Sequence, residues 1–179
     1  MPYEPLPDLA TLSLAEIAAL NDARKLPPVS QWKPQVSGDS LMTIRADGRW
    51  FHDGGEIRRP AMIRAFAGLL RREADGGYYL VTPVEKQSIK IEDAAFIATD
   101  VVAQDGALAF RLNTDEVVVA GPDHPLAARG AAELPAIYLA VRNGCEARIN
   151  RSTWLQLVDL ADEDLCIISQ GARFALVPA

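Results

Sequence analysis

Residues 41–56, LMTIRADGRWFHDGGE, contain two turn signals on either side of a short run of bulky residues. Asp47-Gly48 lies between two strand-like runs, which is the strongest short-range hairpin signal. A second turn is expected at residues 53–56, directly after the bulky run at residues 50–52. Tight turns this close together connect neighbouring antiparallel strands, so the stretch predicts antiparallel β-structure.

Turn signals of the same kind recur through the rest of the chain. They are Asp105-Gly106, Asn143-Gly144 and Gln170-Gly171. Residues 88–92 alternate polar and apolar side chains, as expected for a strand with one face in water. Short connections and repeated tight turns favour antiparallel pairing over a parallel sheet. We therefore expect mainly β-structure from residue 39 onward.

Three segments are predicted as helices. Residues 13–25 open with Ser13 and Glu16, which have the spacing of a capping box. Residues 60–72 place Pro60 in the first turn and two arginines in the last turn, where positive charge complements the helix dipole. We expect the glycines that follow Asp75 to end this helix. Residues 150–161 form the third, shorter helix.

The segment between the first helix and the first strand is predicted to be an extended connector. Residues 26–35 hold three prolines, which disfavour regular helix and strand. Trp32 is the large aromatic residue of this segment, and we expect it to pack the connector onto the core.

The second half of the chain echoes the first. Residues 47–55 align with residues 114–122 at an offset of 67, and residues 79–93 align with residues 138–152 at an offset of 59. These offsets imply that the second copy has lost about eight residues where the first carries the Pro60 helix. We expect an α+β fold of two antiparallel β-rich domains related by duplication, at residues 1–105 and 106–179, with a helix packed on each.

The composition limits the classes of partner. The formal net charge is −6, from 18 Lys and Arg against 24 Asp and Glu, and neither half is basic. Duplex nucleic acids and anionic membranes need clustered basic residues, so we expect neither as a partner. No apolar run approaches about 18 residues and no signal peptide opens the sequence, which predicts a cytoplasmic protein. A small anion held by a local arginine cluster remains compatible with this charge.

No sequence motif indicates a metal, a cofactor or a catalytic residue. The two histidines and two cysteines are too few for a convincing zinc set. We interpret Cys145 and Cys166 as small buried apolar residues of a reducing compartment. Nucleophile-elbow, P-loop and dinucleotide-binding motifs are absent from the sequence. An enzyme is therefore the less favoured class.

Four segments together resemble a bacterial family of uncharacterised proteins, known as a domain of unknown function. They are residues 47–59, 78–96, 123–129 and 137–154, within a resemblance that covers nearly the whole chain from Pro28 onward. The resemblance implies a duplicated core and a barrel-like C-terminal half similar to pleckstrin-homology domains. It also implies a nucleotide-like ligand between the halves, in a signalling role. It supplies no catalytic residue, and Asp53-Gly54 stands where the family usually has Glu-Gly.

Ionisable residues in loops and strands of both copies are the candidate ligand-binding residues. They are His52, Arg58, Glu85, Lys86, His124, Arg142 and Arg148. Five of them have a structural alternative: Arg58 can pair with a neighbouring acid, the Glu85-Lys86 pair can form a simple exposed turn, and the strand arginines can point outward.

The leading functional hypothesis is a ligand-binding or sensory module that holds a small anion in the groove between the domains. The nucleotide-like identity of that anion rests on the resemblance alone. A protein–protein adaptor that uses sheet edges is one alternative. A hydrolase that uses His52 or His124 is the second. The hypothesis requires the candidate residues of both copies to meet at one cleft.

Overall fold

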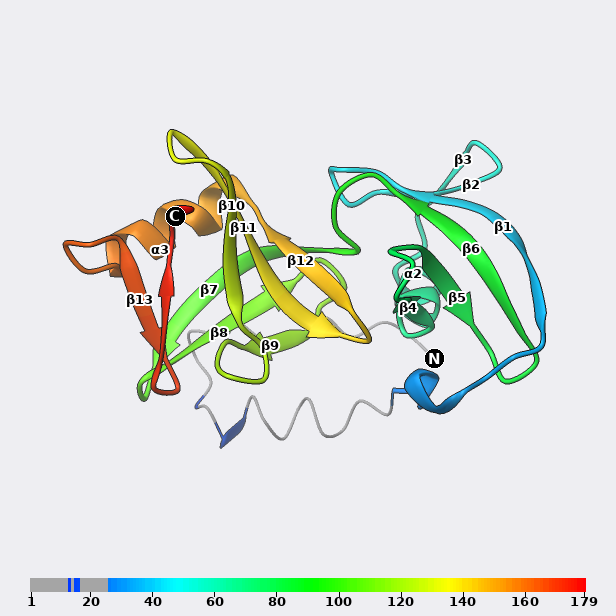
Figure 1. Cartoon of the computed structure of the whole chain (residues 1–179), viewed down its shortest axis with the longest axis horizontal. Coiled ribbons are helices and arrows are strands. Elements are labelled where there is room, and N and C mark those ends of the chain that lie inside the picture. Colours follow the sequence, from blue (N-terminus) through cyan, green and yellow to red (C-terminus); the bar gives the residue numbers. More distant parts are fainter. Residues whose placement is uncertain (1–12, 14, 17–25) are drawn as a thin grey trace.

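The computed structural model describes Ser13, Ala15, Glu16 and residues 26–179, which form two β-rich domains side by side (Figure 1). The capping box predicted at the start of the first helix is present. The Ser13 N–H donates to Glu16 Oε2 (2.6 Å), and the Glu16 N–H donates to Ser13 Oγ (3.2 Å). The remainder of that predicted helix lies outside the described residues.

The first domain is a six-stranded sheet with one helix. Its elements are β1 (Val36–Ile44), β2 (Trp50–His52), β3 (Gly55–Ile57), α2 (Pro60–Ala67), β4 (Leu70–Arg72), β5 (Tyr78–Val81) and β6 (Glu85–Ile91). The strand order is β3-β2-β1-β6-β5-β4. Every neighbouring pair is antiparallel except β1 and β6, which are parallel.

The second domain repeats this sheet and adds a helix and a hairpin. Its elements are β7 (Phe96–Gln104), β8 (Ala107–Leu112), β9 (Val117–Val119), β10 (Leu126–Ala131), β11 (Leu134–Arg142), β12 (Cys145–Ile149), α3 (Arg151–Leu160), β13 (Cys166–Ser169) and β14 (Ala172–Ala175). The sheet order is β10-β11-β12-β7-β8-β9, again with one parallel pair, β7 and β12. The β13–β14 hairpin packs against β8 and β10, so it covers the gap in the curled sheet and gives the domain its barrel-like form (Figure 1).

The predicted duplication is confirmed by the strand order. In each copy three consecutive antiparallel strands are followed by three more, and the first and last strands pair in parallel. The helices differ: α2 lies between the third and fourth strands of its copy, whereas α3 follows the sixth. The expected α+β fold of two similar domains is therefore confirmed, with one parallel pair in each sheet that hairpin signals do not reveal.

The strand order corrects the first of the two sequence alignments. The β1–β2 turn at Asp47-Gly48 corresponds to the β7–β8 turn at Asp105-Gly106, an offset of 58, whereas residues 114–122 contain the next turn along. The second alignment is correct, since β5 with Tyr79 corresponds to β11 with Tyr138. The inferred loss of about eight residues is thus wrong, because longer strands in the second copy replace the length of α2.

The predicted domain boundary and the predicted end of the second helix also differ from the structure. Residues 105 and 106 form the turn of the β7–β8 hairpin, so β7 belongs to the second sheet. The helix ends at Ala67, and residues 70–72 form β4 instead of its last turn. Leu70 is fully buried and pairs with Leu80 of β5. Burial and sheet pairing override the helical pattern here.

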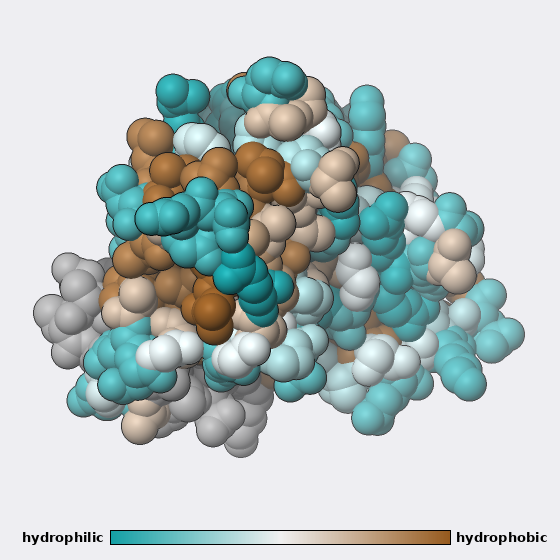
Figure 2. All heavy atoms as spheres, turned by 60° about the vertical axis from the view of Figure 1, so that its left-hand side comes forward, coloured by the Kyte–Doolittle hydropathy of each residue, from teal (hydrophilic) through white to brown (hydrophobic). Residues whose placement is uncertain are grey.

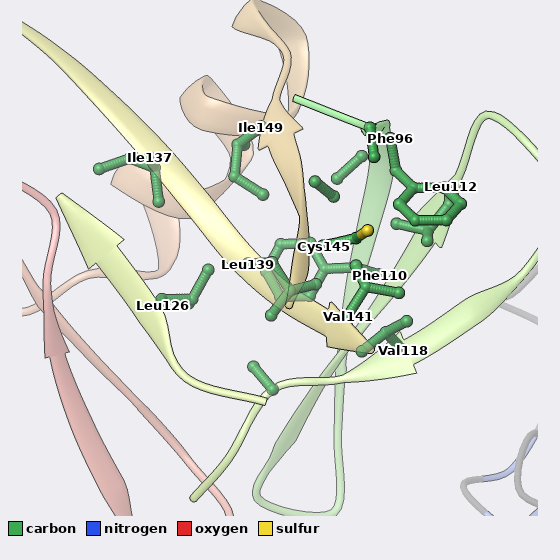
Figure 3. Close-up of a cluster of buried hydrophobic side chains, with 14 of the residues drawn as sticks. Phe96, Phe110, Leu112, Val118, Leu126, Ile137, Leu139, Val141, Cys145 and Ile149 are labelled. Atoms are coloured by element: carbon green, nitrogen blue, oxygen red, sulfur yellow. The ribbon is translucent and has the colours of Figure 1, made fainter. Parts of the chain in front are cut away.

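One hydrophobic core runs through both domains. It joins Trp50, Leu70 and Ile89 of the first domain to the interior of the curled second sheet. Figure 3 shows Phe96, Phe110 and neighbouring aliphatic side chains filling that interior. Cys145 is buried among them, as predicted, and burial raises the pKa of its thiol to about 11. Cys166 is only half-buried.

Two tight turns, one from each domain, lie on the partner domain. The β1–β2 turn places Gly48 against Ile97 and Asn113 of the second domain. The β11–β12 turn lies on β4, where the Arg72 N–H donates to the Asn143 carbonyl (2.9 Å). Because these contacts use backbone and turn residues, they fix how the two sheets meet.

Apolar side chains are exposed on the outer side of the second domain. Leu155 and Leu160 on α3, Leu165 in the following loop and Ile168 on β13 are all exposed. Figure 2 shows hydrophobic residues gathered on this side of the molecule. Among the described residues, no helix is long and apolar enough to span a bilayer.

The connector is held to the first domain by Val29 and Arg71. Val29, in the 3₁₀ turn η2 (Val29–Gln31), is fully buried, whereas the expected anchor Trp32 is half-buried. Arg71 Nη1 donates to the carbonyls of Val29 (3.0 Å) and Trp32 (2.8 Å). Glu73 accepts from Arg71 and from Lys86, each at 2.7 Å. Glu73 therefore orients the arginine that holds the connector.

We expect this cluster to make stability fall in acid. Hydrogen bonds from Lys86 and Arg71 lower the pKa of Glu73 below its usual 4.5. A lowered folded-state pKa contributes stability above the unfolded value, and that contribution is lost as the pH falls through the folded pKa. Urea unfolding between pH 7 and pH 3 should show a weaker pH dependence in Glu73→Gln than in the wild type. The exposed control Glu133→Gln should keep the wild-type dependence, and an unchanged slope in Glu73→Gln would contradict the assignment.

Candidate functional site

The candidates of the first copy do not form one site. His52 lies exposed at the end of β2, and Arg58 is exposed after β3, where its Nε donates to Glu56 (2.9 Å). Lys86 at the start of β6 bonds Glu73 and lies over the Tyr79 ring at 4.5 Å, so it belongs to the connector cluster. Glu85 is half-buried next to it, and its carbonyl accepts from the Thr82 N–H (2.9 Å).

His124 also has a structural role. It lies in the loop before β10, and its Nδ1 is 3.0 Å from the Ala140 carbonyl. Because a carbonyl only accepts hydrogen bonds, Nδ1 is the protonated nitrogen and donates. The histidine therefore ties the loop to β11, in a different domain from His52.

Arg142 lies at the interface between the domains. Its guanidinium makes two hydrogen bonds to Glu116, whose side chain is almost fully enclosed, and a third to the Ala67 carbonyl (3.3 Å) at the end of α2. It also lies over the Phe96 ring at 5.1 Å. Both Nη atoms of Arg142 donate to protein acceptors, in Glu116 of the second domain and Ala67 of the first. Arg142 therefore joins the two domains instead of facing an open site.

Arg148 on β12 lies beside the linker that joins the two sheets. Its Nη1 donates to Asp93 Oδ2 (3.1 Å) and to the Tyr138 hydroxyl oxygen (3.2 Å). The Tyr138 hydroxyl in turn donates to Asp93 Oδ1 (2.6 Å). The other N–H groups of Arg148 have no acceptor among the residues that the structure describes. Of the seven predicted residues, Arg148 lines the pocket between the domains that is described next.

The pocket has a volume of about 510 Å³ and is open to solvent. Segments of both domains form it: the β1–β2 turn, the linker, β7, the β8–β9 turn, the end of β12 and the start of α3. Its lining residues are Ala46, Asp47, Asp93, Ile97, Thr99, Asn113, Arg148, Ile149, Asn150 and Arg151. Its volume is within the range of small-molecule sites, which commonly form between domains.

The second domain contributes the positive side of the pocket. Asn150 caps α3 by accepting from the Thr153 N–H (3.0 Å), while the first N–H groups of any helix have no partner within it. Arg151 is exposed, and among the described residues it makes no ion pair. Two guanidinium groups beside a helix start are suited to a carboxylate or a phosphate.

The first domain and the linker contribute the negative side, Asp47 and Asp93. Hydrogen bonds from the Arg49 backbone and side chain lower the pKa of Asp47, so its carboxylate stays charged at neutral pH. Asn113 and Ile97 also line the pocket. The side-chain oxygen of Asn113 accepts from the Ile97 N–H (3.0 Å), which holds the β8–β9 turn against the start of β7. Among the described residues, no group of His, Cys, Asp and Glu is arranged to hold a metal ion.

Sequence reasoning missed Asp47, Asp93, Asn113, Asn150 and Arg151 as site residues. One signal for Asn150 and Arg151 was present in the sequence. A helix was predicted to begin at residue 150, and an asparagine at that position is a typical N-cap, which marks a helix start with free N–H groups. Asp93 comes from the linker, and Asp47 and Asn113 come from two different turns, so only the folded chain brings them together.

Family comparisons agree with the two-domain structure. Residues 27–94 match the N-terminal domain of DUF1285, and residues 95–176 match its C-terminal domain. The chain belongs to the DUF1285 family. Both parts are described as being of unknown function, and they meet at the linker between β6 and β7. The resemblance seen in the sequence is therefore confirmed.

Two solved DUF1285 structures resemble this one. A protein from Silicibacter pomeroyi DSS-3 has 38% sequence identity and a TM-score of 0.77, over 91% of this chain and 95% of the other. A protein from Shewanella baltica OS155 has 24% identity and a TM-score of 0.56, over 67% and 91% of the two chains, and shows a similar fold. No curated protein matches the sequence.

Proposed function

We propose that this chain is a sensory or ligand-binding module that holds a small anionic ligand in the pocket between its domains. The observation that carries the proposal is Arg148, which lines the pocket with N–H groups directed neither to Asp93 nor to Tyr138. Arg151 and the start of α3 add donors beside it. A phosphate or carboxylate would accept charge-assisted hydrogen bonds from these groups, which are among the stronger ones in proteins.

The site differs from the one expected from the sequence. His52, Arg58, Lys86 and His124 lie elsewhere, and Arg142 is engaged by Glu116, so the proposal rests on Arg148 and on pocket residues around it. A nucleotide-like ligand and a signalling role remain part of the proposal through the family resemblance. The hydrolase alternative has less support, since neither histidine lines the pocket.

A ligand of this kind should raise the melting temperature. At about 100 times Kd a ligand stabilises the folded state by about 2.7 kcal/mol, which corresponds to roughly 5–10 °C for a chain of this size. Thermal unfolding should be followed with nucleoside mono-, di- and triphosphates, phosphorylated metabolites and amino acids at millimolar concentration. Arg148→Met should abolish the shift. Arg129→Met, which removes an arginine paired with Glu146 in the same sheet, should retain it. No shift with any compound would contradict the proposal.

A protein–protein adaptor is the second candidate. The observation that favours it is the set of exposed apolar side chains on α3, the following loop and β13 (Figure 2). Apolar surface of this kind is more often found where another protein binds than on a solvent-facing helix. The pocket uses the first residues of α3, Asn150 and Arg151, whereas the exposed apolar side chains of the helix begin one turn later at Leu155, so the two functions rely on different residues.

A further inference from the structure

We infer that the ligand of the pocket is a zwitterion, with an ammonium group and a carboxylate or phosphate a few bonds apart. This inference rests on the proposed function and specifies its ligand class. It comes from the distribution of charge around the pocket, which is not that of a simple anion site. Two carboxylates, Asp47 and Asp93, line it together with two guanidinium groups, Arg148 and Arg151.

The two signs of charge come from different parts of the chain. Asp47 lies in the β1–β2 turn of the first domain and Asp93 in the linker, whereas Arg148 and Arg151 belong to the second domain. A simple anion bound to the arginines would be repelled by both carboxylates. A ligand that carries both charges meets an opposite charge at each end and spans the boundary between the domains.

Asp93 has the capacity to bind an ammonium group. Its Oδ1 accepts one hydrogen bond from Tyr138 and its Oδ2 one from Arg148. An ionised carboxylate has about four acceptor positions, so both oxygens can accept further N–H groups. Tyr138 and Arg148 thus fix the orientation of the carboxylate. Asp47 is held in the same way by Arg49, through its backbone N–H (3.0 Å) and its Nε (2.8 Å).

Asp93 also sets the selectivity between the two ligand classes. For a simple anion, Asp93 competes for Arg148 and repels the ligand, so its neutralisation should strengthen binding. For a zwitterion, the same change removes the partner of the ammonium group, so binding should weaken. The substitution Asp93→Asn therefore has opposite effects on the two classes. Asparagine has the same shape and still accepts from Tyr138, so the fold should be retained.

The test is isothermal titration calorimetry of the full chain with pairs of ligands, in which one member carries an ammonium group and the other lacks it. Glycine, glutamate and phosphoethanolamine are paired with acetate, glutarate and ethyl phosphate, and the other common amino acids extend the panel. We expect at least one zwitterion to bind ten times more tightly than its matched anion. Asp93→Asn should weaken that zwitterion at least tenfold and strengthen the anion several-fold. Asp123→Asn, which removes an exposed acid outside the pocket, should change neither.

The other possible outcomes contradict either the zwitterion inference alone or the proposed function as well. Anions that bind as tightly as their zwitterions, or nucleotides that bind more tightly in Asp93→Asn while still depending on Arg148, would overturn the zwitterion inference and leave the anion site standing. If no compound of either class binds, or binding does not depend on Arg148, the proposed function and this inference both fail. Phosphoethanolamine against the amino acids separates a phosphate from a carboxylate as the anionic group.

Discussion

Glu116→Ala is expected to lower the free energy of unfolding by about 3–5 kcal/mol, the range measured when one partner of a buried ion pair is removed. Glu116 is nearly buried and accepts both hydrogen bonds that Arg142 directs toward it. Without Glu116, the arginine stays enclosed by Phe96 and the end of α2 with its charge unpaired. Urea unfolding at neutral pH measures the loss.

A double substitution shows whether the unpaired charge is the cause. Glu116→Leu with Arg142→Leu removes both charges, and replacement of buried pairs by apolar residues is often neutral or stabilising. We expect the double variant to recover most of the stability lost in Glu116→Ala. With the single variants Glu116→Leu and Arg142→Leu it completes a double-mutant cycle, which should give a large coupling energy. A loss below about 1 kcal/mol in the single variant, as in exposed pairs, would contradict the enclosed character of this pair.

Gly48→Ala is expected to cost about 2–5 kcal/mol. Gly48 has φ +87°, a conformation that costs an L-residue about 1–2 kcal/mol. An added Cβ would also lie 2.8 Å from Ile97 Cγ1 and 3.0 Å from Asn113 Nδ2 of the second domain, and overpacking adds about 1–3 kcal/mol. Chemical unfolding followed by tryptophan fluorescence measures the total.

Gly106→Ala separates the two contributions. Gly106 is the corresponding turn glycine of the second copy, with φ +75°, but no atom lies within 4 Å of the place that an added Cβ would take. It should show only the conformational cost of about 1–2 kcal/mol. Equal losses in the two variants would mean that the β1–β2 turn does not press against the second domain.

The sequence predicted the hairpins because their signals are local. Asp47-Gly48, Asp105-Gly106, Asn143-Gly144 and Gln170-Gly171 all form tight turns with positive φ at the glycine. The repeat was found at Tyr79 and Tyr138, which occupy corresponding strands. It was misaligned at residues 114–122 because a turn followed by three bulky residues describes any hairpin, so a shift by one strand is not apparent from the sequence.

The parallel strand pairs and the pocket depend on long-range contacts. Nothing local shows that β1 pairs with β6, or that residues 70–72 leave a helical pattern to pair with β5. Asp47, Asp93 and Arg151 line the pocket from three separate segments of the chain. A single charged residue in a sequence does not show which distant residues will lie next to it after folding. Arg148 was predicted on the expectation that the two copies face one another, and its alternative, an outward-facing strand residue, was equally compatible with the alternation of the strand.

The parallel pairs have a consequence for how the chain is made. Since the first strand of each copy pairs with its last, neither sheet can be completed until the ribosome has released almost all of that copy. The first domain can close once β6 has emerged, whereas β7 must wait for β12 while its edge is open to wrong partners. Pairings between ends distant in the chain form slowly, and unpaired edges invite aggregation.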